Sequence, residues 1–152
     1  MFSLLFPILF MQAATPSPEA DDERCWKTEV HGTVRVKAYQ GDRGCVDFTP
    51  PRQMSGIWVN EFEGSAFHDG AQSIADIHGK KGDVWFSLDN QTELPPNFKR
   101  EYGHAYRITI IGSTAIDMNR KPLHGYGHMN MARGLVLADR IIAMEDLGSV
   151  RR

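Results

Sequence analysis

The sequence has little cysteine, no long basic run and no apolar segment long enough to cross a membrane as a helix. Its two cysteines, Cys25 and Cys45, are too few for a disulfide scaffold and have neither zinc-knuckle nor Cys-x-x-Cys spacing. No basic run exceeds two residues, as at Lys80-Lys81, and the formal net charge is −2. Because such a chain has no field that gathers phosphates, we expect no nucleic-acid partner.

Motifs that mark common enzymes are also missing. The sequence contains no nucleophile elbow, phosphate-binding loop or zinc-protease motif, and it shows no internal repeat. Its 152 residues, 41% of them hydrophobic, suit a single domain with one core. These properties favour a non-enzymatic binding or envelope-associated interaction module.

The amino-terminal stretch has the pattern of a secretory signal peptide. Phe2 to Met11 are almost wholly apolar, which suits the hydrophobic region of a signal, and Ala13 and Ala14 offer small residues for cleavage. Pro7 interrupts the run and no basic residue precedes Arg24, so an amino-terminal strand or buried helix is the alternative. No cysteine follows the run directly, and we expect no stable membrane anchor after signal removal.

This pattern assigns residues 1–14 to a signal peptide, 15–24 to a disordered leader rich in Pro, Ser and acids, and 25–148 to one domain. Export would place the protein in the periplasm or outside the cell. In that oxidising environment Cys25 and Cys45 are expected to pair, the alternative being two separate thiols.

Several stretches of the remaining sequence predict β-strands, and two of them, 30–38 and 106–111, alternate side chains between two faces as half-buried strands do. Residues 30–38 predict a first strand, which turns back through a glycine-rich stretch into a second strand at 45–48. Further main strands are predicted at residues 84–88, 106–111 and 134–144, and residues 57–59 predict a short strand that covers one end of the core. The strand at 134–144 carries a bulge or bend at Ala138 to Arg140. Residues 66–78 predict a short helix or turn, and 89–104 a long loop.

Five main strands with little helix predict a mainly β protein. We expect a small five-stranded antiparallel barrel with at most a short helix. At this size the oligonucleotide/oligosaccharide-binding (OB) type of barrel is the best match.

Two short blocks, Ser55 to Phe67 and Gly125 to His128, resemble small exported bacterial proteins with OB-like barrels and no assigned activity. The resemblance implies a fold and a compartment, and it implies no reaction.

A soft-metal site is one hypothesis for the closing part of the chain. Met129 and Met131 would point their sulfurs to one face of an extended strand, and thioethers with imidazole suit Cu(I). The stretch is similar to small periplasmic copper and silver carriers, which are OB-like barrels with a Met-x-Met pair, a histidine and a stacking Trp. The resemblance implies ligands at Met129, Met131 and either His124 or His128, although Tyr126 stands where a Trp would be expected. The alternative is that both methionines pack in the barrel core.

A zinc site is a second hypothesis, with His124 and His128 joined by His68, His104 or Asp69. The glycines between the two histidines disfavour a helix there. The alternative use of His128 is to fix its loop by bonding to the backbone. Apart from copper or zinc, no cofactor is indicated.

Acid/base catalysis is a further hypothesis, because Glu61, Glu63, His68 and Asp69 could form the site of a small hydrolase-type enzyme if they converge in a cleft. The alternative is a solvated strand face.

The leading hypothesis is a binding module. Trp58, Phe67 and Tyr126 are candidate contacts if they are exposed, and core residues if they are not. The acidic balance favours a protein, a glycan or a small ligand as partner.

Overall fold

The computed structural model describes residues 24–150, which fall into two compact units, one ending at Gln40 and one beginning at Gly41. Each unit is described by itself. The expected signal peptide and nearly all of the leader lie outside the described residues. Between residues 24 and 150, no helix is long and apolar enough to span a membrane.

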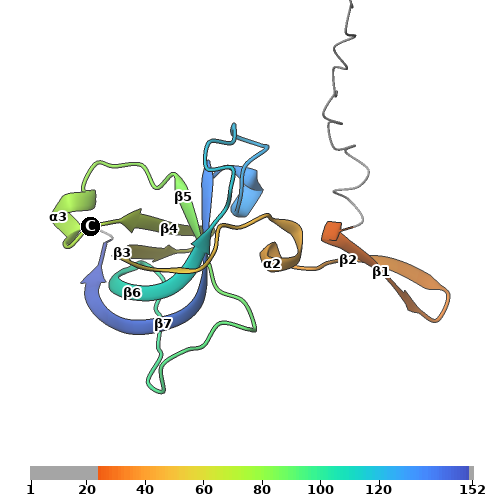
Figure 1. Cartoon of the computed structure of the whole chain (residues 1–152), viewed down its shortest axis with the longest axis horizontal. Helices are drawn as coiled ribbons and strands as arrows, with labels where there is room; N and C mark the ends of the chain where they lie inside the picture. Colours follow the sequence, from red (N-terminus) through yellow and green to blue (C-terminus); the bar gives the residue numbers. More distant parts are fainter. Residues whose placement is uncertain (1–23, 151–152) are drawn as a thin grey trace, which may run out of the picture. The chain divides into compact units, whose positions relative to one another are not determined.

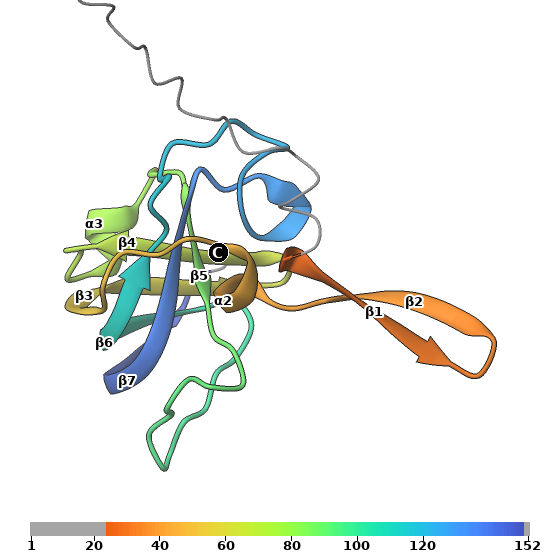
Figure 2. The same cartoon turned by 45° about the vertical axis from the view of Figure 1, so that its right-hand side comes forward.

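The first unit is an antiparallel hairpin of β1 (Trp26–His31) and β2 (Val34–Tyr39), shown in Figure 2. The prediction of one strand over residues 30–38 was wrong, because the chain reverses between His31 and Val34. Gly32 has a φ of 64°, a left-handed conformation that glycine adopts without steric cost. A tight turn leaves the apolar alternation of the sequence intact, so the pattern hides it.

Residues 45–48 do not form the predicted return strand. Cys45 ends the short helix α2 (Asp42–Cys45), and Phe48 forms an isolated bridge with Ala115. Cys25 and Cys45 are disulfide-bonded, as the sequence predicted for an oxidising compartment.

The second unit contains a closed barrel of five strands (Figure 1). The strands are β3 (Arg52–Glu61), β4 (Gly64–Asp69), β5 (Val84–Ser87), β6 (His104–Thr114) and β7 (Gly134–Ser149). They follow the order β3-β4-β5-β7-β6 around the barrel, and β6 closes on β3. The helix α3 (Ile74–Ile77) lies between β4 and β5, and the 3-10 turn η1 (His128–Asn130) lies between β6 and β7.

The predicted barrel is confirmed, but its purely antiparallel character was wrong. β5 and β7 run parallel, from the pair Val84 and Gly134 to the pair Ser87 and Leu137. Side chains alternate in the same way in parallel and antiparallel strands, so the sequence pattern cannot distinguish them. The short apolar stretch at 57–59 proved to be the middle of β3, which pairs with both β4 and β6.

The bulge predicted in the last strand is confirmed. Ile111 pairs with Arg140 and Gly112 with Ala138, so Asp139 is the extra residue in β7. Arg43 of α2 donates hydrogen bonds to Asp139 (2.6 Å) and, on the loop after β5, to Asp89 (2.7 Å). The bulge thus aims a carboxylate at the guanidinium that holds α2 on the barrel.

The barrel core is built on Trp58, Phe86 and Tyr106, all of which are buried. The indole of Trp58 lies 5.1 Å from the Phe86 ring and 5.3 Å from the Tyr106 ring, measured between centroids.

The β4–β5 seam has a single ladder pair, Ala66 with Trp85. The hydroxyl of Ser65 reinforces this seam by donating to the Phe86 carbonyl (2.6 Å). The same hydroxyl accepts a hydrogen bond from Trp58 Nε1 (3.0 Å).

Candidate ligand-binding groove

The barrel surface is hollowed along the β4–β5 seam by two adjoining clefts, of about 240 and 400 Å³. Both clefts are lined by Glu61, Glu63, Gly64, Ser65, Trp85 and His128. We call the two clefts together the seam groove. Lys81 and Met131 line one cleft, whereas Arg100 and Tyr102 line the other.

Trp85 forms the apolar part of the groove. Successive side chains of a strand point to opposite faces, so Phe86 enters the core while Trp85 faces the other way. The indole is partly buried against a cluster that includes Tyr126 and Leu135. A Cβ atom added at Gly127 would lie 2.1 Å from this ring, so the backbone of the β6–β7 connection rests directly on the indole.

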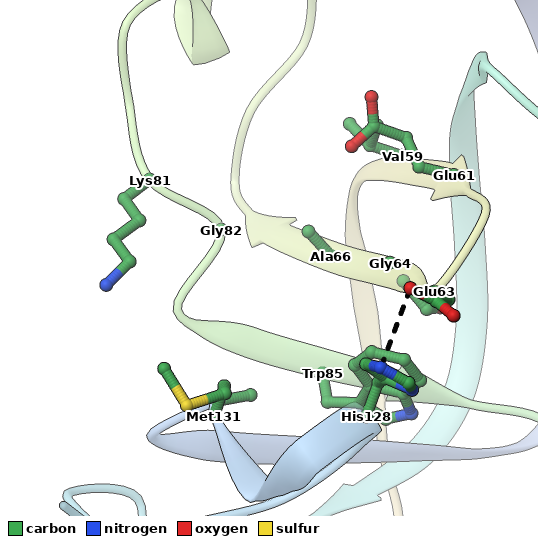
Figure 3. A pocket seen from close by; sticks show the side chains of 12 residues that line it. Val59, Glu61, Glu63, Gly64, Ala66, Lys81, Gly82, Trp85, His128 and Met131 are labelled. Atoms are coloured by element: carbon green, nitrogen blue, oxygen red, sulfur yellow. Dashed lines mark ion pairs between the residues drawn. The ribbon is translucent and has the colours of Figure 1, made fainter. Parts of the chain in front are cut away.

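His128 and Glu63 face each other across the groove, with Nε2 and Oε2 3.7 Å apart (Figure 3). Glu63 lies in the β3–β4 turn with a φ of 57°, and His128 opens η1. Both side chains are about half exposed, so the ion pair contributes little to folding. It brings together two loops that are far apart in the sequence.

The β6–β7 connection is anchored beneath the groove by Tyr126. Its hydroxyl donates to the Asp117 carbonyl (2.8 Å), and the Arg120 guanidinium lies 4.5 Å from its ring centre. Burial raises the pKa of this phenol. Gly125 packs on the Ala132 carbonyl too closely for any Cβ. These contacts fix the segment that presents His128 to the groove.

An exposed aromatic pair lies at the Arg100 end of the groove. Phe62 of the β3–β4 turn is 70% exposed and Tyr102 is 67% exposed. Their rings meet edge to face with centroids 6.4 Å apart. Exposed aromatic rings beside a cleft provide contact area for a ligand.

The three predicted contact aromatics occupy other positions. Trp58, Phe67 and Tyr126 are 1%, 3% and 4% exposed, so their rings pack inside the protein. The groove presents Trp85 and Tyr102 instead, which the sequence reasoning missed. The adjacent aromatics Trp85 and Phe86 were a usable signal, since one of two neighbouring strand residues must face away from the core.

The methionines proposed as soft-metal ligands are solvent-exposed, Met129 at 66% and Met131 at 46%. The expectation of an extended strand here was wrong, because Met129 lies inside η1 with a φ of 54°. The alternative that both methionines pack in the core was also wrong. Met131 and His128 line the same cleft, and His124 is exposed without lining the groove.

The candidate zinc ligands do not form a cluster among the described residues. Over residues 24–150, no group of three or more His, Cys, Asp or Glu side chains is placed to hold a metal ion. His104 lies with Nδ1 2.9 Å from an Asp146 carboxylate oxygen, on the far strands β6 and β7.

The four residues considered for acid/base catalysis divide between two clefts. Glu61 and Glu63 line the seam groove. His68 and Asp69 instead line a cleft of about 660 Å³ beside α3. Burial, followed by the nearby Lys80 charge, lowers the pKa of His68. The two carboxylates and the imidazole therefore do not converge.

The fold and the groove together define a small closed β-barrel with a ligand-sized depression along one seam. Comparisons of the chain with family models, with curated proteins and with solved structures found no match. The function is therefore inferred from the groove itself.

Proposed function

We propose that the protein is an exported binding module with an OB-like barrel that holds an extended, uncharged, hydroxyl-rich ligand such as an oligosaccharide in the seam groove. The observation that carries the proposal is the position of the groove. OB barrels bind along their second and third strands and the loops after the first and fourth. Here those elements are β4, β5, the β3–β4 turn and the β6–β7 connection, and all four line the groove.

The charges of the groove support an uncharged ligand. Glu61 and Glu63 would repel a polyanion along the seam. Lys81 in one cleft and Arg100 in the other would repel a polycation. Carboxylate, ammonium and guanidinium groups all form hydrogen bonds with hydroxyls. The indole of Trp85 and the ring of Tyr102 add the flat apolar surfaces that pack on sugar rings.

Export is supported by the disulfide of Cys25 and Cys45, because such bonds persist in oxidising compartments. The apolar amino-terminal stretch of the sequence agrees with this assignment.

The test is an NMR titration of the ¹⁵N-labelled protein with neutral oligosaccharides of several linkages. A heparin fragment and an oligolysine peptide serve as charged comparators. We expect the Trp85 indole and the backbone amides of Glu63 and His128 to shift with at least one neutral oligosaccharide. Tyr102→Ala should weaken this binding roughly tenfold, as the loss of one stacked ring does. Tyr39→Ala, which removes an exposed tyrosine of the hairpin, should leave the affinity unchanged.

Two results would contradict the proposal in different ways. If only a charged comparator shifted the groove signals, the groove would bind and the ligand class would be wrong. If neither the neutral nor the charged probes shifted them, the seam groove would not be the binding site.

A further inference from the structure

The β1–β2 hairpin leaves several large apolar side chains exposed. Val30 is 63% exposed, Val34 58%, Tyr39 49% and Trp26 41%. A two-stranded hairpin is at best marginally stable in water, and either further strands with an apolar face or packing against a helix are needed for independent stability. A strand paired with the open edge of β1 would extend the sheet and supply such an apolar face.

The charged residues of β1 indicate which strand would pair with it. Lys27 and Glu29 lie on one face and flank Thr28 on either side. Inside the hairpin they stand opposite Ala38 and Val36, so neither charge has an oppositely charged residue across the ladder. The sequence around Thr28 is thus complementary to itself when read in the opposite direction.

We propose that two copies of the chain associate by antiparallel pairing of β1 with β1, with the two-fold axis at Thr28. Lys27 of each copy then lies opposite Glu29 of the other, and the two Thr28 residues face each other. Opposite charges, paired threonines and aromatic with β-branched residues are the cross-strand pairs that stabilise sheets. An isologous contact of this kind closes as a dimer and leaves no further edge of β1 open.

The register also builds an apolar row. Trp26 of one copy lies opposite Val30 of the other, on the opposite face of the sheet from the charged pairs. Trp26 already packs on Tyr39, with ring centroids 5.3 Å apart. The apolar row therefore crosses three strands: Tyr39 and Trp26 of one copy, then Val30 of the other. The two-fold axis generates a second, identical row.

Self-pairing of β2 about its central residues is less favourable. A two-fold axis at Val36 would set Arg35 of β2 against Lys37 of the second copy, and like charges directly opposite destabilise a sheet. Moving the axis in β1 by one residue sets Lys27 or Glu29 against its own copy. Of these four registers, only the one centred on Thr28 places opposite charges face to face.

A charge-swap experiment on the full chain tests the proposal by analytical ultracentrifugation. The wild type should dimerise. Lys27→Glu alone and Glu29→Lys alone create two like-charge pairs and should raise the dimer dissociation constant roughly tenfold or more. The double variant Lys27→Glu, Glu29→Lys should recover the wild-type constant, and an equimolar mixture of the two single variants should form a heterodimer.

The swaps are matched controls for one another, because both positions are exposed and face apolar residues within the hairpin. A wild type that stays monomeric at every accessible concentration would overturn the proposal. So would a dimer that neither single substitution weakens, or a double variant that fails to recover. The oligosaccharide titration monitors signals of the barrel and not of the β1 edge. A negative titration would therefore leave the dimer test unaffected.

Discussion

Ser65→Ala should destabilise the barrel far more than the loss of one hydroxyl suggests. The Ser65 hydroxyl accepts from Trp58 Nε1 and donates to the Phe86 carbonyl, at a seam with a single ladder pair. Its removal leaves the indole N–H of a fully buried Trp58 without this acceptor and the carbonyl without this donor. An unsatisfied buried polar group costs about 1–3 kcal/mol, and we expect a net loss of about 2 kcal/mol.

The loss would be measured by urea unfolding followed by tryptophan fluorescence. In a domain of this size it corresponds to a fall in Tm of roughly 6–10 °C. The matched control is Ser55→Ala, which removes one hydroxyl bond to the Thr109 side chain (3.0 Å). Because Thr109 is only partly buried and can turn its hydroxyl to water, we expect a loss of about 0.5 kcal/mol. Equal effects of the two substitutions would refute the bridging role of Ser65.

The remaining predictions concern the pH dependence of stability and the packing of the groove loop. Arg43 donates to Asp89 and holds the pKa of that carboxyl below its usual range, so this stabilisation is present above the unfolded pKa and is lost as the pH falls through the folded value. Urea unfolding of Asp89→Asn should therefore lose less stability between neutral and acidic pH than the wild type. Gly127→Ala should destabilise the protein by about 2–4 kcal/mol, since Gly127 has a φ of 67° and its Cβ would overlap the Trp85 ring. Gly148→Ala, with a φ of 90° and open space around it, isolates the backbone strain and should cost less.

Either result can fail in a definite way. If Asp89→Asn lost as much unfolding free energy as the wild type between neutral and acidic pH, the ion pair with Arg43 would not account for the acid sensitivity of the fold. Equal losses at Gly127 and Gly148 would show that contact with Trp85 adds nothing to the strain.

The sequence by itself determined the features that depend on local patterns. Alternation located β6, short apolar runs located β5 and β7, and the polar interruption at Asp139 marked the bulge. The pair of cysteines, with an apolar amino-terminal stretch, was sufficient to predict the disulfide.

Tertiary structure alone decided the pairing of those strands and the site. A period of two residues does not state whether β5 meets β7 in parallel, nor that the alternation from Val30 onward passes through a tight turn. The groove depends on contacts between distant segments, with Glu63 of one turn meeting His128 of another over Trp85. Burial, which removed Trp58, Phe67 and Tyr126 from the surface, is a property of the closed barrel. Burial cannot be assigned to an isolated strand, because a strand has a core face only once its neighbours are in place.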